Sequence, residues 1–100
     1  MNIKEKTASL RAGELAVIYI GQAGFIISDG TVSVAVDPYL SYSVDRAIEN
    51  GDGKWTRLYA PPVMPDELSF LDFVFISHDH LGHADPETIS GIAAVSEARF

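Results

Sequence analysis

The chain has 100 residues, a formal net charge of −7 and no cysteine, and 47% of its residues are hydrophobic. A chain of this length forms one small domain, and its hydrophobic content is that of a folded globular protein. The acidic balance argues against nucleic acid as a partner, because binding to phosphates needs clustered Lys and Arg. The longest uncharged run, residues 15–28, is too short to cross a membrane. We therefore expect a soluble, cytoplasmic single domain over residues 1–100 with no membrane partner.

The first part of the chain predicts strands and a β-hairpin. Residues 1–13 form a polar lead-in, and "ELAVIYI" (14–20) then has the β-branched and aromatic composition of a buried strand. An Asp-Gly pair at 29–30 separates the apolar runs "FIIS" (25–28) and "TVSVAV" (31–36), which is a strong hairpin signal. Alternation along the second arm places its three valines on one face and its smaller residues on the other.

The middle of the chain is irregular. Pro38 ends the hairpin because proline cannot donate to a strand ladder. Within residues 38–65, "VDRAIEN" (44–50) favours a short helical turn. Trp55 and Tyr59 could line a substrate pocket, but packing or an interface is the favoured interpretation.

The last part predicts a strand, a loop and a helix in that order. "FLDFVFIS" (70–77) is a compact apolar strand, and we expect residues 73–76 to be buried on both faces. Asp85 is a good helix N-cap and is followed by proline. "ETISGIAAVSEA" (87–98) then predicts a helix with Ile89, Ile92 and Ala93 along one stripe. The order of elements predicts an α/β or α+β fold built in layers.

The loop "SHDHLGHAD" (77–85) holds all three histidines of the chain. His78 and His80 point the same way in an extended chain, and His83 can approach the same centre across a tight turn. The Asp85 carboxylate could orient an imidazole or hold a water molecule. Imidazole ligands suit zinc or iron, and carboxylate partners also admit manganese. A metal site is therefore favoured over a merely solvated loop.

The same loop resembles the H-x-H-x-D-H signature of the metallo-β-lactamase fold hydrolases. "IGQAGFIIS", "VAVDPYLS" and "HDHLGHADPETI" are similar to the branch that contains the L-ascorbate-6-phosphate lactonases. This resemblance implies the N-terminal half of an αββα sandwich, with a mostly antiparallel or mixed sheet and a helix after the histidine loop. The C-terminal half of that sandwich is absent from residues 1–100.

The resemblance also implies a mechanism and a set of site residues. In this family two ions activate a water, and the hydroxide attacks a lactone, lactam, thioester or phosphoester. By position, His78 and His80 would bind the first ion and His83 the second, with zinc or manganese as the metal. Asp37 would act as a catalytic residue that supports the loop, although "DP" as a simple strand terminator is equally favoured. Asp85 is the second catalytic candidate.

One position departs from the family pattern. The family's aspartate, a ligand of the second ion, falls on Gly82, which has no side chain to bind anything. We therefore expect a weakened second site, leaving one ion or none.

Two further positions are interpreted structurally. Gln22, in "GQAG", lies where the family has a loop near the mouth of the site, but a tight turn that needs its flanking glycines is favoured. We expect no Ser–His–Asp arrangement, because Ser77 and His78 are neighbours that face opposite ways along a strand.

Two hypotheses of function remain. The first is a metal-dependent hydrolase acting on a small ester or lactone, such as a sugar-acid lactone or a phosphorylated relative. The second is a truncated or degenerate, non-catalytic module that binds a metal weakly or a protein partner. A half-sandwich exposes a sheet face, so we expect either poor stability or a homo-oligomer in which a second copy covers that face. Whether the chain alone is an enzyme is left open, because the family takes further ligands from its second half.

Overall fold

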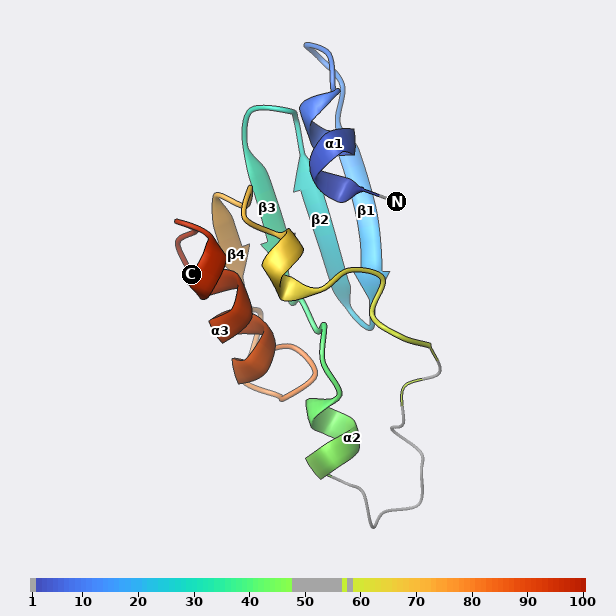
Figure 1. Ribbon diagram of the computed structural model, residues 1–100, viewed down its shortest axis with the longest axis vertical. Helices are drawn as coiled ribbons and strands as arrows, with labels where there is room; N and C mark the ends of the chain where they lie inside the picture. Colours follow the sequence, from blue (N-terminus) through green and yellow to red (C-terminus); the bar gives the residue numbers. More distant parts are fainter. Residues whose placement is uncertain (1, 48–56, 58) are drawn as a thin grey trace.

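The computed structural model describes residues 2–47, 57 and 59–100, which form a sheet with helices on one face and a further short helix beyond its end (Figure 1). Its four strands, in spatial order, are β1 (Ala16–Gly21), β2 (Gly24–Ser28), β3 (Ser33–Val36) and β4 (Phe73–Phe75). The first three run antiparallel, and β4 runs parallel to β3. The helices are α1 (Ile3–Ala8), α2 (Ser43–Ala47), the 3-10 helix η1 (Pro65–Glu67) and α3 (Pro86–Val95). The predicted layered α/β arrangement, with a mixed sheet and a helix after the histidine loop, is confirmed.

The Asp-Gly hairpin between β2 and β3 is also confirmed. Ser28 pairs with Ser33 at the end of the antiparallel ladder next to the turn. The Asp29 carboxylate accepts hydrogen bonds from the backbone N–H groups of Val32 and Thr31, each at 2.8 Å. These hydrogen bonds, that of Val32 first, hold the pKa of Asp29 below its ordinary value. Gly30 has φ +91°, which glycine adopts at no steric cost.

The polar lead-in is a helix in part, which corrects the prediction for residues 1–13. Asn2 caps α1 through its side-chain oxygen, which accepts from the N–H of Glu5 at 3.0 Å. Ile3 and Thr7 are buried, and Ile3 belongs to the main hydrophobic core. One turn and a half of helix carries too few apolar residues to show a helical period in the sequence. Tertiary packing therefore decides this element.

The core lies between the sheet and the helices. Inward side chains from all four strands meet residues from the helices and from the segment after η1. The buried residues that form this cluster are Ile3, Ala16, Ile18, Ile20, Ile26, Ala35, Leu40, Val63, Leu68, Leu71, Val74 and Ile92. On β3 the small residues face the helices, and Val34 and Val36 are half-buried on the other side.

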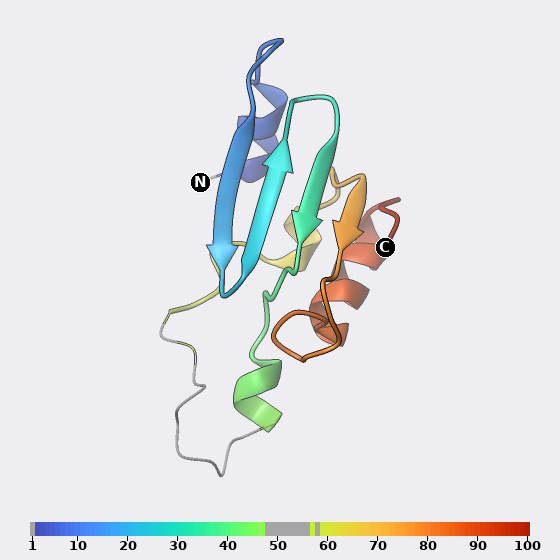
Figure 2. The same ribbon diagram turned by 180° about the vertical axis from the view of Figure 1, so that it is seen from behind.

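No helix of the described residues covers the opposite face of the sheet (Figure 2), and the side chains exposed on it are apolar. Its exposed side chains are Val17, Tyr19, Phe25, Phe73 and Phe75, and Phe75 is 57% exposed. The expectation that residues 73–76 are buried on both faces is therefore wrong: only Val74 is fully buried, and Ile76 is half-buried. A short apolar run has the same composition whether other elements cover one face of the strand or both. The sequence therefore does not show whether a second layer covers the sheet.

The predictions for the C-terminal helix and for the middle of the chain are confirmed in part. Asp85 caps α3 as predicted, and Ile92 is buried, but Ala93 is exposed and the second buried position is Thr88. The helical turn expected over 44–50 is present as α2 up to Ala47. Residues 48–50 and Trp55 lie outside the described residues, whereas Tyr59 is described and exposed. Within the described ranges, no helix has the length and apolar character needed to span a membrane.

Candidate metal centre

The site forms where the two parallel strands end. Val36 pairs with Phe75 in the register of β3 and β4, and the N–H of Asp37 donates to the carbonyl of Phe75 at 2.9 Å. Parallel strands bring their carboxyl ends to the same edge of a sheet, which is where α/β proteins place their ligands. Asp37 and the histidine loop that begins with Ser77 therefore meet, although many residues separate them in the sequence.

Asp37 is the buried anion of this edge. It is 5% exposed and has φ +45°, a left-handed conformation that is uncommon outside glycine and often marks functional sites. Its Oδ1 accepts from the Ser77 N–H at 2.7 Å, and its Oδ2 accepts from the Ser77 hydroxyl at 2.5 Å and contacts His83 Nδ1 at 2.8 Å. Burial raises the pKa of Asp37, but the hydrogen bonds from Ser77 and His83 lower it by more. The pKa of Asp37 is therefore below its ordinary value.

These contacts fix the protons on two imidazoles. The only proton of the Ser77 hydroxyl goes to Asp37, so the 2.8 Å contact between Ser77 Oγ and His78 Nδ1 requires an N–H on the histidine. His83 likewise donates its Nδ1 proton to the Asp37 carboxylate, which is ionised at neutral pH. In the neutral form of each ring the lone pair is therefore on Nε2. A carboxylate behind an imidazole is the usual device that orients a metal-binding histidine.

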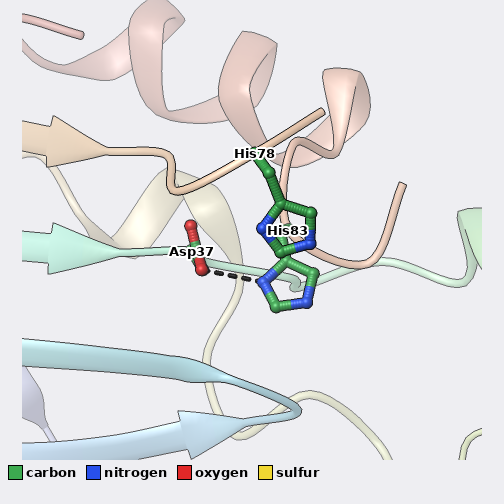
Figure 3. Close-up of side chains that lie close together, drawn as sticks. All are labelled: Asp37, His78 and His83. Atoms are coloured by element: carbon green, nitrogen blue, oxygen red, sulfur yellow. Dashed lines mark hydrogen bonds and ion pairs between the residues drawn. The ribbon is translucent and has the colours of Figure 1, made fainter. Parts of the chain in front are cut away.

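The ligand atoms converge. One ligand atom from each of Asp37, His78 and His83 lies within 4.8 Å of the others (Figure 3). The ring centroids of His78 and His83 are 4.0 Å apart. Zinc and manganese accept imidazole nitrogens, and the Asp37 carboxylate, which holds Nδ1 of His83, adds a negative charge beside them. This set therefore fits a divalent ion.

His80 lies beside this group but outside it. Its ring meets that of His78 edge-on with centroids 4.6 Å apart. Its carbonyl accepts from the N–H groups of His83 at 2.9 Å and Ala84 at 2.8 Å, which closes the turn of the loop. The role of His80 as a ligand stays a prediction.

Asp85 ends the histidine loop as the N-cap residue of α3, and it is completely buried. Its carboxylate accepts from the hydroxyls of Ser41, Ser43 and Thr88, and from the N–H groups of Glu87 and Thr88. Burial raises the pKa of Asp85, and the hydrogen bonds from Ser41, Ser43 and Thr88 outweigh it, so the net pKa is below its ordinary value. These contacts tie the segment after β3 to α3. Asp85 is not among the converging ligand atoms, and a catalytic role for it stays a prediction.

Ser77 is the site residue that the sequence did not identify. The expectation of no Ser–His–Asp arrangement assumed an extended chain, but β4 ends at Phe75 and the backbone bends from His78 onward. Serine, histidine and aspartate therefore do meet. The hydroxyl donates to the aspartate and not to the histidine, so this arrangement holds a tautomer and does not activate a serine nucleophile.

The fold and the site define an α/β domain with an Asp/His/His group at the end of two parallel strands. Residues 16–98 match the family described as the beta-lactamase superfamily domain. The chain therefore belongs to the beta-lactamase superfamily, and its fold is a partial metallo-β-lactamase fold.

Three relatives are mycobacterial proteins. The chain is 33% identical over 89 residues to proteins of Mycobacterium bovis and of Mycobacterium tuberculosis strains H37Rv and CDC 1551 / Oshkosh, each described as uncharacterized. The aligned segment is 89% of this chain and 23% of each relative. The chain thus spans about a quarter of the length of these curated relatives.

Proposed function

We propose that this chain is the metal-binding part of a metal-dependent hydrolase. The observation that carries the proposal is the convergence of Asp37, His78 and His83, with both imidazoles held as Nε2 donors. Membership of the beta-lactamase superfamily supports the same chemistry. A bound divalent ion supplies Lewis acidity and activates a water as the nucleophile.

The chain's own residues prepare the site. The Asp37 carboxylate keeps a proton on His83 Nδ1 and, through the Ser77 hydroxyl, on His78 Nδ1. The same carboxylate adds a negative charge close to the ligand nitrogens, which favours a cation there. His80 completes the loop turn through its backbone and presents its ring next to His78. The loop is thereby held in one conformation before an ion arrives, which reduces the cost of binding.

We propose zinc or manganese as the ion and one ion as the stoichiometry. Position 82 carries no side chain, so a second ion lacks the carboxylate that the family pattern places there. For the substrate we propose a small lactone or ester, with a phosphorylated sugar acid as one candidate. The motifs "IGQAGFIIS" and "VAVDPYLS" support this branch by resemblance alone.

Metal binding is the experiment that tests the proposal. The purified chain is stripped with a chelator and titrated with Zn²⁺ and Mn²⁺, alone and as the variants His78→Ala and His83→Ala. We expect close to one ion per chain, and a loss of affinity of more than about tenfold in each variant. Asp66→Asn, at an exposed acidic position, is the control and should bind as the wild type does. Unchanged binding in both histidine variants would overturn the proposal.

Activity is tested separately with the metal-loaded protein. Lactones and phosphodiesters are assayed before and after exhaustive chelation. Hydrolysis that depends on the ion supports the hydrolase. Hydrolysis that persists without it would rule out this mechanism.

The open sheet face favours a second candidate, a non-catalytic module that associates with a protein partner. Five large apolar side chains of β1, β2 and β4 are exposed there, and monomeric proteins rarely leave such a face uncovered. We propose a second copy of this chain as the partner. Metal binding without hydrolysis, together with stable self-association, would favour this candidate over the enzyme.

A further inference from the structure

Gln22 is held in a strained conformation at the tip of the β1–β2 hairpin. Its φ is +57°, and among the described residues only Gln22 and Asp37 combine a side chain with a positive φ. The Tyr19 hydroxyl donates to the Gln22 carbonyl at 2.8 Å, and the Tyr19 ring packs on Phe25 with centroids 5.2 Å apart. Glycine would meet the needs of this turn without strain, so the turn alone does not account for a glutamine.

The side chain of Gln22 lies over Gly82. A Cβ atom on residue 82 would be 3.1 Å from Nε2 of Gln22 and 3.8 Å from its Cδ. The Gln22 carboxamide therefore occupies space that a side chain on residue 82 would enter. Residue 82 directly precedes His83. The carboxamide, which comes from the β1–β2 hairpin, therefore lies against the metal-binding loop.

A carboxamide has the planar shape of a carboxylate but no charge. Its oxygen accepts hydrogen bonds and can bind a hard cation, and its nitrogen donates two hydrogen bonds. Beside the residue that precedes His83, such a group has the chemistry to contact a single ion, or a water or substrate oxygen. It cannot offset the charge of a second divalent ion as an aspartate would.

We infer that the Gln22 carboxamide stands in for the missing side chain of residue 82 as a polar contact of the metal site, and that the pair Gln22 and Gly82 sets the site for one ion. This inference rests on the proposed metal site. Gln22 is thus a binding residue supplied by the hairpin, and the absence of a side chain at Gly82 leaves space for its carboxamide.

The test measures metal affinity in variants that tolerate the turn. Gln22→Asn and Gln22→Gly both accept a positive φ, and they retract or remove the carboxamide. We expect each to weaken Zn²⁺ and Mn²⁺ binding by roughly tenfold, at the lower end of the effect of groups that support metal ligands. The far-UV circular dichroism of the metal-free protein should stay unchanged, and its melting temperature should not fall. Gln22→Glu should bind the first ion at least as tightly as the wild type.

The pairing with Gly82 is tested by a double-mutant cycle. Gly82→Asp alone must push the Gln22 amide aside, whereas Gly82→Asp with Gln22→Gly gives the new carboxylate free space. We expect the double variant to bind a second ion more tightly than Gly82→Asp alone, by about tenfold or more. Additive effects on affinity would overturn the pairing.

His78→Ala in the same titration separates this inference from the proposed function. If His78→Ala abolishes binding while Gln22→Asn and Gln22→Gly bind as the wild type does, the inference is wrong and the metal site stands. If His78→Ala and His83→Ala both bind normally, or the wild type binds no ion, the proposed function and the inference both fall.

Discussion

The Nδ1 atom of His83 lies 2.8 Å from Oδ2 of Asp37, although 46 positions separate the two residues in the chain. The contact joins the end of β3 to the far side of the histidine loop. It exists because β3 and β4 run parallel, so that their carboxyl ends meet at one edge. Asp37 therefore sets both the position of the loop and the tautomer of its last histidine.

The first prediction concerns the charge of Asp37. Asp37→Asn keeps the shape of the side chain but removes the anion that accepts from Ser77 and His83. We expect Zn²⁺ affinity to fall by about 10- to 100-fold, as for other groups that orient metal ligands. Isothermal titration calorimetry measures the affinity, and Asp66→Asn is the control for the loss of one negative charge. Equal affinity in Asp37→Asn and the control would show that Asp37 only ends the strand.

The second prediction concerns Ser77, whose hydroxyl links Asp37 to His78. Ser77→Ala removes the group that holds the proton on His78 Nδ1. We expect the metal-free variant to show a mixture of His78 tautomers, while His83 keeps its proton on Nδ1. Long-range proton–nitrogen NMR spectra of the imidazoles distinguish the two forms. An unchanged His78 tautomer in Ser77→Ala would contradict the role assigned to the hydroxyl.

The third prediction concerns the stability that Asp85 provides. Asp85→Ala removes the N-cap of α3 and leaves the buried hydroxyls of Ser41 and Thr88 without their acceptor. A lost cap costs about 1 kcal/mol, and a stranded buried polar group about 1–3 kcal/mol. We expect the free energy of unfolding to fall by about 3 kcal/mol in urea titrations. The control, Glu87→Ala, loses only an exposed ion pair with Arg46 and should change it by less than about 1 kcal/mol.

The same carboxylate gives this stability a pH dependence. The pKa of Asp85 is lower in the folded chain than its ordinary value of about 3.9. The ionised form is therefore favoured by folding, and its contribution is fully present above pH 4. It is lost as the pH falls below that value through the folded pKa. The difference in unfolding free energy between the wild type and Asp85→Ala should stay constant from pH 5 to 8 and narrow in more acidic solution. A difference that grows on acidification would contradict this sign.

The parts of the fold that could be predicted from the sequence are those encoded locally. Asp29 and Gly30 specify their turn through hydrogen bonds and a positive φ within a few residues, and Asp85 specifies a helix start through its own backbone neighbours. The convergence of the histidines was expected from their spacing, and His78 and His83 do meet.

The rest depends on contacts between distant segments. Ser77 acquires its role only because the end of β3 lies beside it, and Gln22 reaches Gly82 only because the hairpin tip folds over the loop. Neither relation leaves a local pattern. The short α1 helix was missed for the same reason, because the burial of Ile3 in the core stabilises it. The sequence also could not show which apolar residues of β4 lack a covering layer.

The last prediction concerns that open face of the sheet. Its aromatic side chains form two pairs, Tyr19 with Phe25 and Phe73 with Phe75, whose ring centroids are 5.2 Å and 6.3 Å apart. Covering this surface removes apolar area from water, which favours association, whereas the net charge of −7 opposes it. We expect the chain to self-associate in a concentration-dependent way, and more strongly at higher ionic strength because salt screens the repulsion.

Light scattering coupled to size-exclusion chromatography measures this association. Val17→Lys combined with Phe75→Lys places two charges on the open face and should yield a monomer with an unchanged circular dichroism spectrum. The matched control, Met64→Lys combined with Val95→Lys, adds the same charges at exposed apolar positions outside the face and should associate as the wild type does. Two lysines also reduce the net negative charge, so a loss of association in the first variant alone cannot come from charge repulsion. A wild-type chain that stays monomeric at every concentration and salt would show that a second copy does not cover this face.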